Sequence, residues 1–292
     1  MTDCNNTIAF QGAMGAYSDL ACRAVYPDMK TLPCHTFEET FAAVAGGRAA
    51  LAMIPIDNTV AGRVADIHHL LPNSSLHIIG EHFQRVDHHL LALPGTKIEE
   101  LTHVHSHVHA LPQCRNIIRE LGLETVVYAD TAAGAKMIAE RGEKNHAAIA
   151  SELAGEIYGL ESLRANIEDA EHNTTRFLIM APEAASPPLD GRDWVTSFVF
   201  KVRNVPAALY KAMGGFATNG VNMTKLESYQ IGGKFFATQF YADIQGHPDE
   251  APVARAMDEL AFFSKELTIL GVYPAHPFRL AQNGSHAEEA EG

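Results

Sequence analysis

The feature that most constrains the fold is the alternation of short apolar runs with segments of helical periodicity over roughly the first 180 residues. Apolar runs of this kind are typical of buried strands, and the intervening segments are typical of helices that connect parallel strands. The predicted strands are residues 7–10, 49–54, 76–79, 88–93, 125–128 and 147–150, and the predicted helices are residues 37–45, 64–71, 115–121 and 132–140. The pattern predicts an α/β fold.

A change in composition marks a domain boundary after this region. Residues 181–193 (APEAASPPLDGRD) contain three prolines and a glycine without periodicity, which is typical of a linker. Beyond it, strands are predicted at residues 195–202, 222–228, 234–243 and 267–273, and helices at residues 206–217 and 253–263. This β-α-β-β-α-β order predicts a ferredoxin-like α+β unit. The polar, acidic residues 275–292 are predicted to form a flexible tail.

Charge and hydropathy exclude several classes of partner. The chain has 22 Lys and Arg against 35 Asp and Glu, a formal charge of −13, and no basic block, so we expect no nucleic-acid partner. Its apolar runs are shorter than the ~18 residues that span a membrane, and its first residues lack the pattern of a secretion signal. We therefore expect a cytoplasmic protein without a membrane partner. Cys4, Cys22, Cys34 and Cys114 form no C-x-x-C motif and are predicted to be reduced, mostly buried thiols.

Four predicted strand-to-helix junctions are rich in glycine, hydroxyl and amide residues. They are residues 10–18 with Ser18 as helix cap, residues 54–62 with Asn58 or Thr59 as cap, residues 105–107 before a helix that holds Gln113, and residues 150–152. Helix starts offer N–H donors, and the carboxyl ends of parallel strands converge on one crevice, so a small anion is the predicted ligand. The alternative is structural, because such caps begin most helices. The segment Gly12-x-x-Gly15 fits no nucleotide-binding motif, so no nucleotide cofactor is predicted.

The histidines allow two interpretations. His103, His105, His107 and His109 alternate with other residues and would share one face of a strand, as a metal patch would. The strand is expected to end near His105, and no carboxylate or cysteine stands at ligand spacing, so no metal is predicted. The adjacent pairs at residues 68–69 and 88–89 are interpreted as surface or packing residues.

A polar segment precedes the apolar run 178–180. It reads Asn173-Thr174-Thr175-Arg176-Phe177 and places a hydroxyl beside a guanidinium. Arg176 is a candidate for bidentate binding of a carboxylate. The alternative is a surface ion pair between Arg176 and Glu168 or Glu171.

These segments, in this order, resemble the prephenate dehydratase family over about residues 7–273. The motifs that carry the resemblance are GAMGAYS, PIDNTVAG, SHVHALPQC, IASELAGEIYGL and the Thr175-Arg176-Phe177 signature. The C-terminal unit, with NMTKLES at residues 222–228, resembles a regulatory ACT domain. The resemblance implies decarboxylative dehydration of prephenate to phenylpyruvate in L-phenylalanine biosynthesis, without a cofactor. It also implies phenylalanine as an allosteric effector and a homodimer or homotetramer. The alternatives are an arogenate dehydratase and a non-catalytic two-lobed metabolite sensor.

The resemblance further implies a domain plan and a set of site residues. The catalytic domain, residues 1–182, would be two-lobed like type II periplasmic binding proteins, with lobe 1 at residues 1–82 and 175–182 and lobe 2 at residues 83–174. The ACT domain would be residues 194–274. Thr175 would be the catalytic hydroxyl. The substrate-binding residues would be Asn58, Thr59, Ser106, Gln113 and Phe177, with Arg176, Tyr17 and Ser18 as added candidates. The effector-binding residues would be Ala207, Ala208, Leu209, Asn222, Glu227 and Ser228.

Several positions depart from the family pattern. Asp57 replaces a glutamate, Ala16 a hydroxyl residue, and Val108-His109 a Pro-Gln pair. In the effector motifs, Ala207 stands where the family has glycine, and Tyr229-Gln230 stand where it has Arg-Pro. Because Thr175 is retained, these departures bear on rate, pH profile and strength of inhibition.

Overall fold

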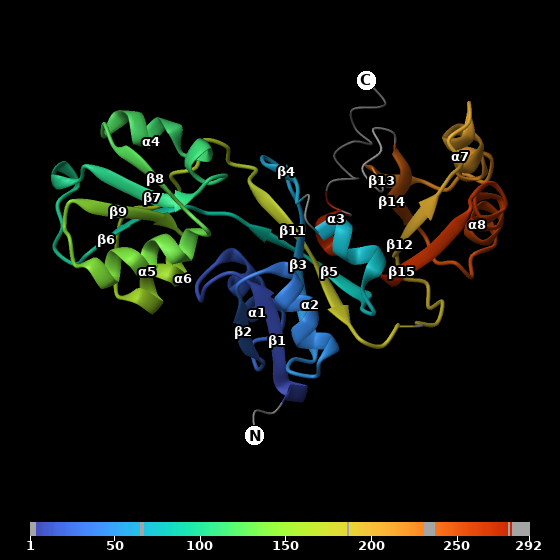
Figure 1. Cartoon of the computed structure of the whole chain (residues 1–292), viewed down its shortest axis with the longest axis horizontal. Coiled ribbons are helices and arrows are strands. Elements are labelled where there is room, and N and C mark those ends of the chain that lie inside the picture. Colours follow the sequence, from blue (N-terminus) through green and yellow to red (C-terminus); the bar gives the residue numbers. More distant parts are fainter. Residues whose placement is uncertain (1–3, 65–66, 186, 231–236, 280, 282–292) are drawn as a thin grey trace. The chain divides into compact units, whose positions relative to one another are not determined.

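The computed structural model describes residues 4–64, 67–185, 187–230, 237–279 and 281. The chain divides into two compact units, Met1–Val64 with His82–Leu178, and Ala65–Glu81 with Ile179–Gly292. The described strands form three sheets, which are traced in Figure 1. None of the described helices is long and apolar enough to cross a membrane.

The first sheet has six strands in the order β2-β1-β3-β11-β5, with β4 paired to β3. Its strands are β1 (Thr7–Gln11), β2 (Lys30–Cys34), β3 (Leu51–Asn58), β4 (Gly62–Arg63), β5 (His77–Arg85) and β11 (Thr174–Ala181). β1 runs parallel to both of its neighbours, and its residues Ile8, Ala9 and Phe10 are fully buried. This burial on both faces explains the continuous apolar run in the sequence. Helices α1 (Tyr17–Val25) and α2 (Phe37–Ala45) pack on this sheet.

The second sheet has the order β10-β6-β9-β7-β8. Its strands are β6 (His89–Ala92), β7 (His103–His107), β8 (Glu124–Tyr128), β9 (His146–Ala150) and β10 (Glu161–Arg164), and its helices are α4 (Arg115–Glu120), α5 (Thr131–Arg141) and α6 (Glu152–Tyr158). β7 is parallel to β8 and β9, whereas β6 is antiparallel to β9 and β10. Both sheets share one strand order. The order β2-β1-β3-β11-β5 of the first sheet corresponds to β8-β7-β9-β6-β10 of the second, and the fourth strand in each, β11 or β6, comes from another part of the chain.

The chain passes between these two sheets twice, at residues 86–88 and 165–173. The two crossing segments lie side by side, because the Val86 N–H donates to the Asn173 carbonyl at 2.9 Å and the Ile167 N–H donates to the His88 carbonyl at 3.0 Å. The loop before α1 also contacts α6. A Cβ on Gly15 would lie 2.7 Å from the Cα of Ala154, and Gly15 has a φ of +83°, so this position requires glycine.

The third sheet is antiparallel, in the order β13-β14-β12-β15. Its elements are β12 (Trp194–Lys201), α7 (Ala208–Thr218), β13 (Met223–Gln230), β14 (Ala237–Gln245), α8 (Ala251–Phe263) and β15 (Glu266–Pro274). Helices α7 and α8 pack side by side and bury Phe198, Phe200 and Leu260 in one core (Figure 1). The predicted α/β fold class and the β-α-β-β-α-β order are confirmed. The expected start of the third strand of this unit, residues 234–236, lies outside the described residues.

Two helix-cap predictions in the first unit are wrong. The chain after β3 forms a hairpin, in which Asn58 pairs with Gly62, and the predicted helix 64–71 is found among the described residues as α3 (Ile67–Leu70) followed by a short 3-10 helix (Leu71–Asn73). Asn58 therefore caps a turn and no helix. Ser18 does not cap α1 either, because this helix already begins at Tyr17.

The predicted tail begins with residues that are held in place. The N–H of His276 donates to Glu81 Oε1 at 3.1 Å, and the Arg279 guanidinium donates to both oxygens of Glu81, with Nε at 2.6 Å and Nη2 at 2.9 Å. The flexible-tail prediction is therefore wrong for residues 275–279. Residues 280 and 282–292 lie outside the described residues.

The cysteine prediction agrees with the structure. All four cysteines are free, with Cys4 exposed and the other three buried. Burial raises the pKa of the Cys22, Cys34 and Cys114 thiols, so these three are poor nucleophiles at neutral pH.

Candidate active site

Thr175 lies at the start of β11, next to the end of β3 in the sheet. The Asn58 side chain, 117 residues earlier, donates from Nδ2 to Thr175 Oγ1 at 2.9 Å. The polar ends of two neighbouring strands thus meet beside the second crossing segment.

The orientation of the Asn58 amide is fixed by the turn that follows it. Its Oδ1 accepts from the Val60 N–H at 2.9 Å and the Ala61 N–H at 2.7 Å, so Nδ2 must face Thr175. Thr175 Oγ1 accepts from Asn58, and no acceptor for the Thr175 hydroxyl proton is found among the described residues, so this proton is available to a ligand. The arrangement can therefore donate a hydrogen bond to a leaving oxygen.

A chain of side-chain hydrogen bonds continues from Asn58 through the crossing segments and the short 3-10 helix Leu111–Gln113 that follows β7. Asn58 Nδ2 also donates to Asn173 Oδ1 at 2.8 Å, and Asn173 Nδ2 donates to Gln113 Oε1 at 2.7 Å. Gln113 Oε1 lies 3.3 Å from His88 Nε2. His88 Nδ1 lies 3.0 Å from the Tyr17 hydroxyl.

The chain of hydrogen bonds ends at the backbone, where the Tyr17 hydroxyl donates to the Asp87 carbonyl at 2.6 Å. The structure thus brings together four predicted residues, Tyr17, Asn58, Gln113 and Thr175. It adds Asn173, quoted in the sequence only as part of a polar segment, and His88, which is buried and packs against the Tyr17 ring as a packing residue would, and which also joins the hydrogen bonds. The sequence feature that could have indicated a role for His88 is its position at the start of a predicted apolar strand.

Burial sets the protonation of the two ring side chains in this chain. Burial, followed by the nearby Cys114, Glu168 and Asp87, raises the pKa of the Tyr17 hydroxyl well above its ordinary value. Burial also lowers the pKa of His88, against the opposing effect of the Gln113 hydrogen bond. Both side chains are therefore neutral near neutral pH.

Thr59 joins the turn to the second crossing segment. Its hydroxyl donates to the His172 carbonyl at 2.7 Å and accepts from the Thr174 N–H at 2.9 Å, while its own N–H donates to the Thr174 carbonyl. The Thr59 hydroxyl thus both donates to and accepts from the protein's own backbone. Thr59 holds the backbone beside Thr175 in this geometry.

Three other predicted residues lie outside this chain of hydrogen bonds. Ser106 is fully buried and donates to the Ile149 carbonyl at 2.6 Å. Phe177 and Ser18 are also buried, with 1% and 8% exposure. In the structure as it stands, these side chains pack inside the protein.

Arg176 is not brought next to the Thr175 hydroxyl. Successive side chains of a strand point to opposite faces, so Arg176 leaves β11 on the face opposite to Thr175. Its Nη1 lies 4.0 Å from Asp57 Oδ2, and its side chain is 7% exposed. Asp57 is thus one partner of Arg176, and the alternative prediction of a surface ion pair was wrong in exposure, because the Arg176 side chain is buried.

The first predicted anion-binding junction is occupied by the protein's own carboxylates. Gly15 N–H donates to Asp19 Oδ2 at 2.8 Å, and Ala13 N–H donates to Asp130 Oδ2 at 3.1 Å. At the fourth junction, the Ser151 hydroxyl accepts from the Ala154 N–H and donates to the Gly15 carbonyl. The contacts of Asp130 and Ser151 join the loop before α1 to the starts of α5 and α6, so the structural alternative holds for both junctions.

The histidine segment forms a contact with another strand. β7 extends to His107, two residues beyond the predicted end, and His105 Nε2 lies 2.7 Å from His146 Nδ1 on β9. Burial, then the neighbouring His146, Arg141 and His103, lowers the pKa of His105 to about 4. Within the described part of the chain, no three or more His, Cys, Asp or Glu side chains are grouped to hold a metal ion.

The predicted effector residues lie on two elements of the second unit. Ala207 has the left-handed φ of +60° and immediately precedes α7, which includes Ala208 and Leu209. Asn222 precedes β13, an edge strand that carries Glu227 and Ser228. The structure contains one chain, so each group is described on its own element.

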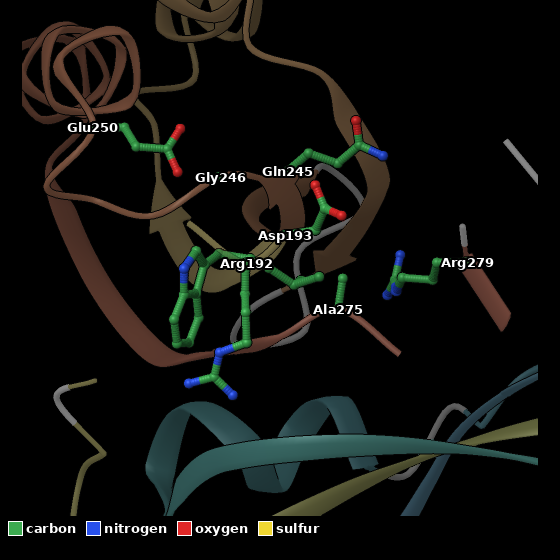
Figure 2. A pocket seen from close by; sticks show the side chains of 9 residues that line it. Arg192, Asp193, Gln245, Gly246, Glu250, Ala275 and Arg279 are labelled. Atoms are coloured by element: carbon green, nitrogen blue, oxygen red, sulfur yellow. The ribbon is translucent and has the colours of Figure 1, made fainter. Parts of the chain in front are cut away.

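The second unit also contains a pocket that the sequence did not predict. Its volume is about 300 Å³, and Figure 2 shows Glu250 and Arg279 on opposite sides of it, with Arg192 at one edge. The Arg192 guanidinium lies 5.0 Å from the centre of the Trp194 ring. None of the predicted effector residues lines this pocket.

Comparison with known proteins identifies the family. The family model for prephenate dehydratase matches residues 8–185. The chain is 57% identical over 272 residues to a bifunctional N-acyl-homoserine lactone acylase/prephenate dehydratase from Komagataeibacter europaeus, covering 93% of this chain and 97% of the relative. It is 37% identical to the chloroplastic arogenate dehydratase/prephenate dehydratase 1 of Arabidopsis thaliana, covering 91% and 71%.

A solved structure supports the same assignment. The prephenate dehydratase from Arthrobacter aurescens, solved in complex with L-Phe, superposes with a TM-score of 0.84 at 29% identity and covers 98% of both chains. The family model spans more than half of this chain, and the relatives span nearly all of it. The chain therefore belongs to the prephenate dehydratase family.

Proposed function

We propose that this protein converts prephenate to phenylpyruvate, with loss of water and carbon dioxide, as a cytoplasmic step of L-phenylalanine biosynthesis. One observation carries the proposal beyond family membership. The Thr175 hydroxyl accepts a hydrogen bond from an Asn58 amide of fixed orientation, and its proton is left for a substrate oxygen.

The reaction asks little of the protein beyond positioning and hydrogen bonding. In prephenate, the bond to the departing carboxylate supplies the electron pair that completes the aromatic ring, while the ring hydroxyl on the opposite carbon leaves as hydroxide and takes a proton from solvent to form water. A threonine hydroxyl is too weak an acid to transfer its proton outright, so Thr175 donates a hydrogen bond as negative charge develops on the leaving oxygen. The hydrogen bond from Asn58 polarises the Thr175 hydroxyl and strengthens it as a donor.

The remaining assignments follow the family plan. The catalytic domain would be residues 1–182, with lobes at residues 1–82 plus 175–182 and at 83–174, and the shared strand order of the two sheets supports this division. Tyr17, Asn58 and Gln113 are the substrate-binding candidates that the chain of hydrogen bonds favours. Arg176 is disfavoured by its position on the opposite face of β11.

The direct test separates the two substrates of the family. Purified protein is mixed with prephenate and with arogenate in separate reactions, and phenylpyruvate and phenylalanine are measured. We expect phenylpyruvate from prephenate at the higher rate. Faster release of phenylalanine from arogenate, as the names of the plant relatives suggest, would assign the alternative activity. Thermal stabilisation by prephenate without any product would favour a non-catalytic sensor.

We also propose feedback inhibition by phenylalanine at an ACT domain over residues 194–274 in a homodimer or homotetramer. The antiparallel four-stranded sheet and the L-Phe complex of the Arthrobacter aurescens relative support this part. The effector would contact Ala207, Ala208 and Leu209 of one subunit, and Asn222, Glu227 and Ser228 of its neighbour. Calorimetric titration with phenylalanine and inhibition kinetics test it, and absence of both heat and inhibition would contradict it.

A second candidate activity comes from the Komagataeibacter europaeus relative, whose name includes N-acyl-homoserine lactone acylase. The 57% identity over nearly the whole of both chains favours testing amide hydrolysis of this substrate class. Wild type and Thr175→Ala should be assayed on both substrates. Loss of both activities in the variant would place them at one site, and loss of dehydration alone would place them at different sites.

A further inference from the structure

His88 occupies the far end of the hydrogen-bond chain from Thr175. It lies in the first crossing segment, its side chain is 1% exposed, and both ring nitrogens have polar neighbours, Tyr17 at Nδ1 and Gln113 at Nε2. We infer that His88 is a positioning residue, whose Nε2–H donates to Gln113 Oε1 and reinforces the amide orientation that leaves the Thr175 proton for the substrate. The inference rests on the proposed function.

The direction of every hydrogen bond in the chain follows from its Asn58 end. Asn58 Oδ1 accepts from two backbone N–H groups, so Nδ2 is the donor to both Thr175 and Asn173. The atom of Asn173 that faces Asn58 must then be its oxygen, and its nitrogen must face Gln113. Gln113 therefore presents Oε1, which accepts and cannot donate. A hydrogen bond to this oxygen requires a proton on His88 Nε2.

The other ring nitrogen completes the assignment. A neutral imidazole with its proton on Nε2 has a lone pair on Nδ1, which accepts from the Tyr17 hydroxyl. The Tyr17 proton is then shared between His88 Nδ1 and the Asp87 carbonyl. The charged or titratable groups around the ring are Glu168, Asp87, His89 and Tyr17, and the carboxylate of Glu168 accepts from the His88 backbone N–H.

Without the donor at residue 88, the Gln113 end of the chain of amides would be held less firmly. Gln113 Oε1 would keep only the hydrogen bond from Asn173, so rotation of the Gln113 amide by half a turn would break one hydrogen bond instead of two. A rotated amide would place its nitrogen against the nitrogen of Asn173. The Asn173 amide would then rotate as well, which would disturb its hydrogen bond with the Asn58 Nδ2 that also donates to Thr175.

The kinetic test uses two variants that differ in which ring nitrogen they replace. In His88→Gln the side-chain nitrogen reaches the position of Nε2 and can donate to Gln113, whereas in His88→Asn the polar atoms reach only the position of Nδ1. Both variants bury a neutral amide, so a general loss of packing would affect both. We expect His88→Gln to keep kcat within about threefold and His88→Asn to lower kcat about tenfold, with KM within about threefold in both. Equal kcat values in the two variants, or a change confined to KM, would overturn the inference.

A spectroscopic test does not depend on activity. Nitrogen NMR of the ¹⁵N-histidine-labelled protein at about pH 8, above the ordinary pKa of histidine, reports which ring nitrogen carries the proton. Comparison with His88→Gln assigns the signals of His88. We expect a proton on Nε2 and none on Nδ1, and the opposite tautomer would overturn the inference even if His88→Asn fails to fold. The expected tautomer in a protein inactive on prephenate and arogenate would contradict the proposed function and leave the hydrogen-bond assignment intact.

Discussion

Asn58 and Thr175 are joined by a hydrogen bond in which the amide nitrogen donates at 2.9 Å and the hydroxyl oxygen accepts. The same amide uses its oxygen to accept from Val60 and Ala61, so a three-residue turn sets the direction of the contact. Among the described residues the Thr175 hydroxyl proton has no acceptor, so this proton is free for a ligand. The Asn58–Thr175 pair therefore carries the chemistry proposed for this site.

Replacement of Thr175 by alanine removes the proposed donor to the leaving oxygen. Loss of one donor that acts in the transition state costs about 10²–10³ in rate, so we expect kcat to fall by this factor with little change in KM. Thr175→Ser keeps the hydroxyl and is the matched control. Turnover of Thr175→Ala near that of the wild type would remove Thr175 from the mechanism.

Replacement of Asn58 by aspartate reverses the Asn58–Thr175 hydrogen bond. A carboxylate keeps the acceptor for Val60 and Ala61, but it can only accept from Thr175 and so takes the proton intended for the substrate. We expect kcat to fall at least about tenfold at neutral pH, with the melting temperature near that of the wild type. A steady-state assay and thermal unfolding measure both. Wild-type kcat in Asn58→Asp would show that the direction of this bond is irrelevant.

Stability should fall in mild acid because of His105. Burial first, then the nearby His146, lowers the pKa of His105 from 6.5 to about 4, so the unfolded chain binds a proton below pH 6.5 that the folded chain does not. The free energy of unfolding is therefore greatest above pH 6.5 and decreases as the pH falls toward 4. We expect His105 to account for about 1–2 kcal/mol of the loss between about pH 7.5 and 5.

Urea unfolding at the two pH values checks the role of His105. His105→Gln should show a smaller difference between them, and His69→Gln, at an exposed position, should behave like the wild type. An unchanged pH dependence in His105→Gln would contradict the assignment.

Arg279 should stabilise the second unit through two buried carboxylates. Its guanidinium binds Glu81 through two nitrogens and lies 3.7 Å from Asp243, and both carboxylates are fully buried. Removal of Arg279 takes the guanidinium away from two buried carboxylates, so Arg279→Met should lower the free energy of unfolding by about 3–5 kcal/mol. The double variant Arg279→Met, Glu81→Gln also removes one of the two buried negative charges and should be more stable than Arg279→Met. Equal stability of the two variants would contradict this account.

Ala207 should be a site where glycine increases stability. Its φ of +60° is left-handed, which costs a residue with a Cβ about 1–2 kcal/mol, and the greater entropy of unfolded glycine offsets part of this. Ala207→Gly should therefore raise the free energy of unfolding by about 0.5–1 kcal/mol. Ala208→Gly, at the first residue of α7 where φ is not left-handed, should bring no such gain. A lower melting temperature for Ala207→Gly would contradict the expectation.

Local patterns of the sequence were sufficient for most elements. The helix Phe37–Ala45 has its predicted bounds, and the strands and helices of the C-terminal unit appear in the predicted order. Hydrophobic periodicity encodes these elements because each must bury one face or one stripe, and this requirement acts over a few neighbouring residues. The motif around Thr175 likewise indicated the family before any contact was known.

The contacts that make the site depend on residues that lie far apart in the chain. From the sequence, Asn58 was interpreted as a helix cap, His88 as a packing residue and Arg279 as part of a flexible tail. The residues next to each of them give no indication of its hydrogen-bond partner, which is Thr175, Gln113 or Glu81 respectively. Those partners meet only when neighbouring strands and crossing segments pack, more than 100 residues apart for Asn58 and nearly 200 for Arg279. Strand alternation then places Arg176 and Thr175 on opposite faces of β11. The sequence supplied the elements and the family signature, and long-range packing supplied the direction of each polar contact, because a donor is oriented only by the acceptor that folding brings to it.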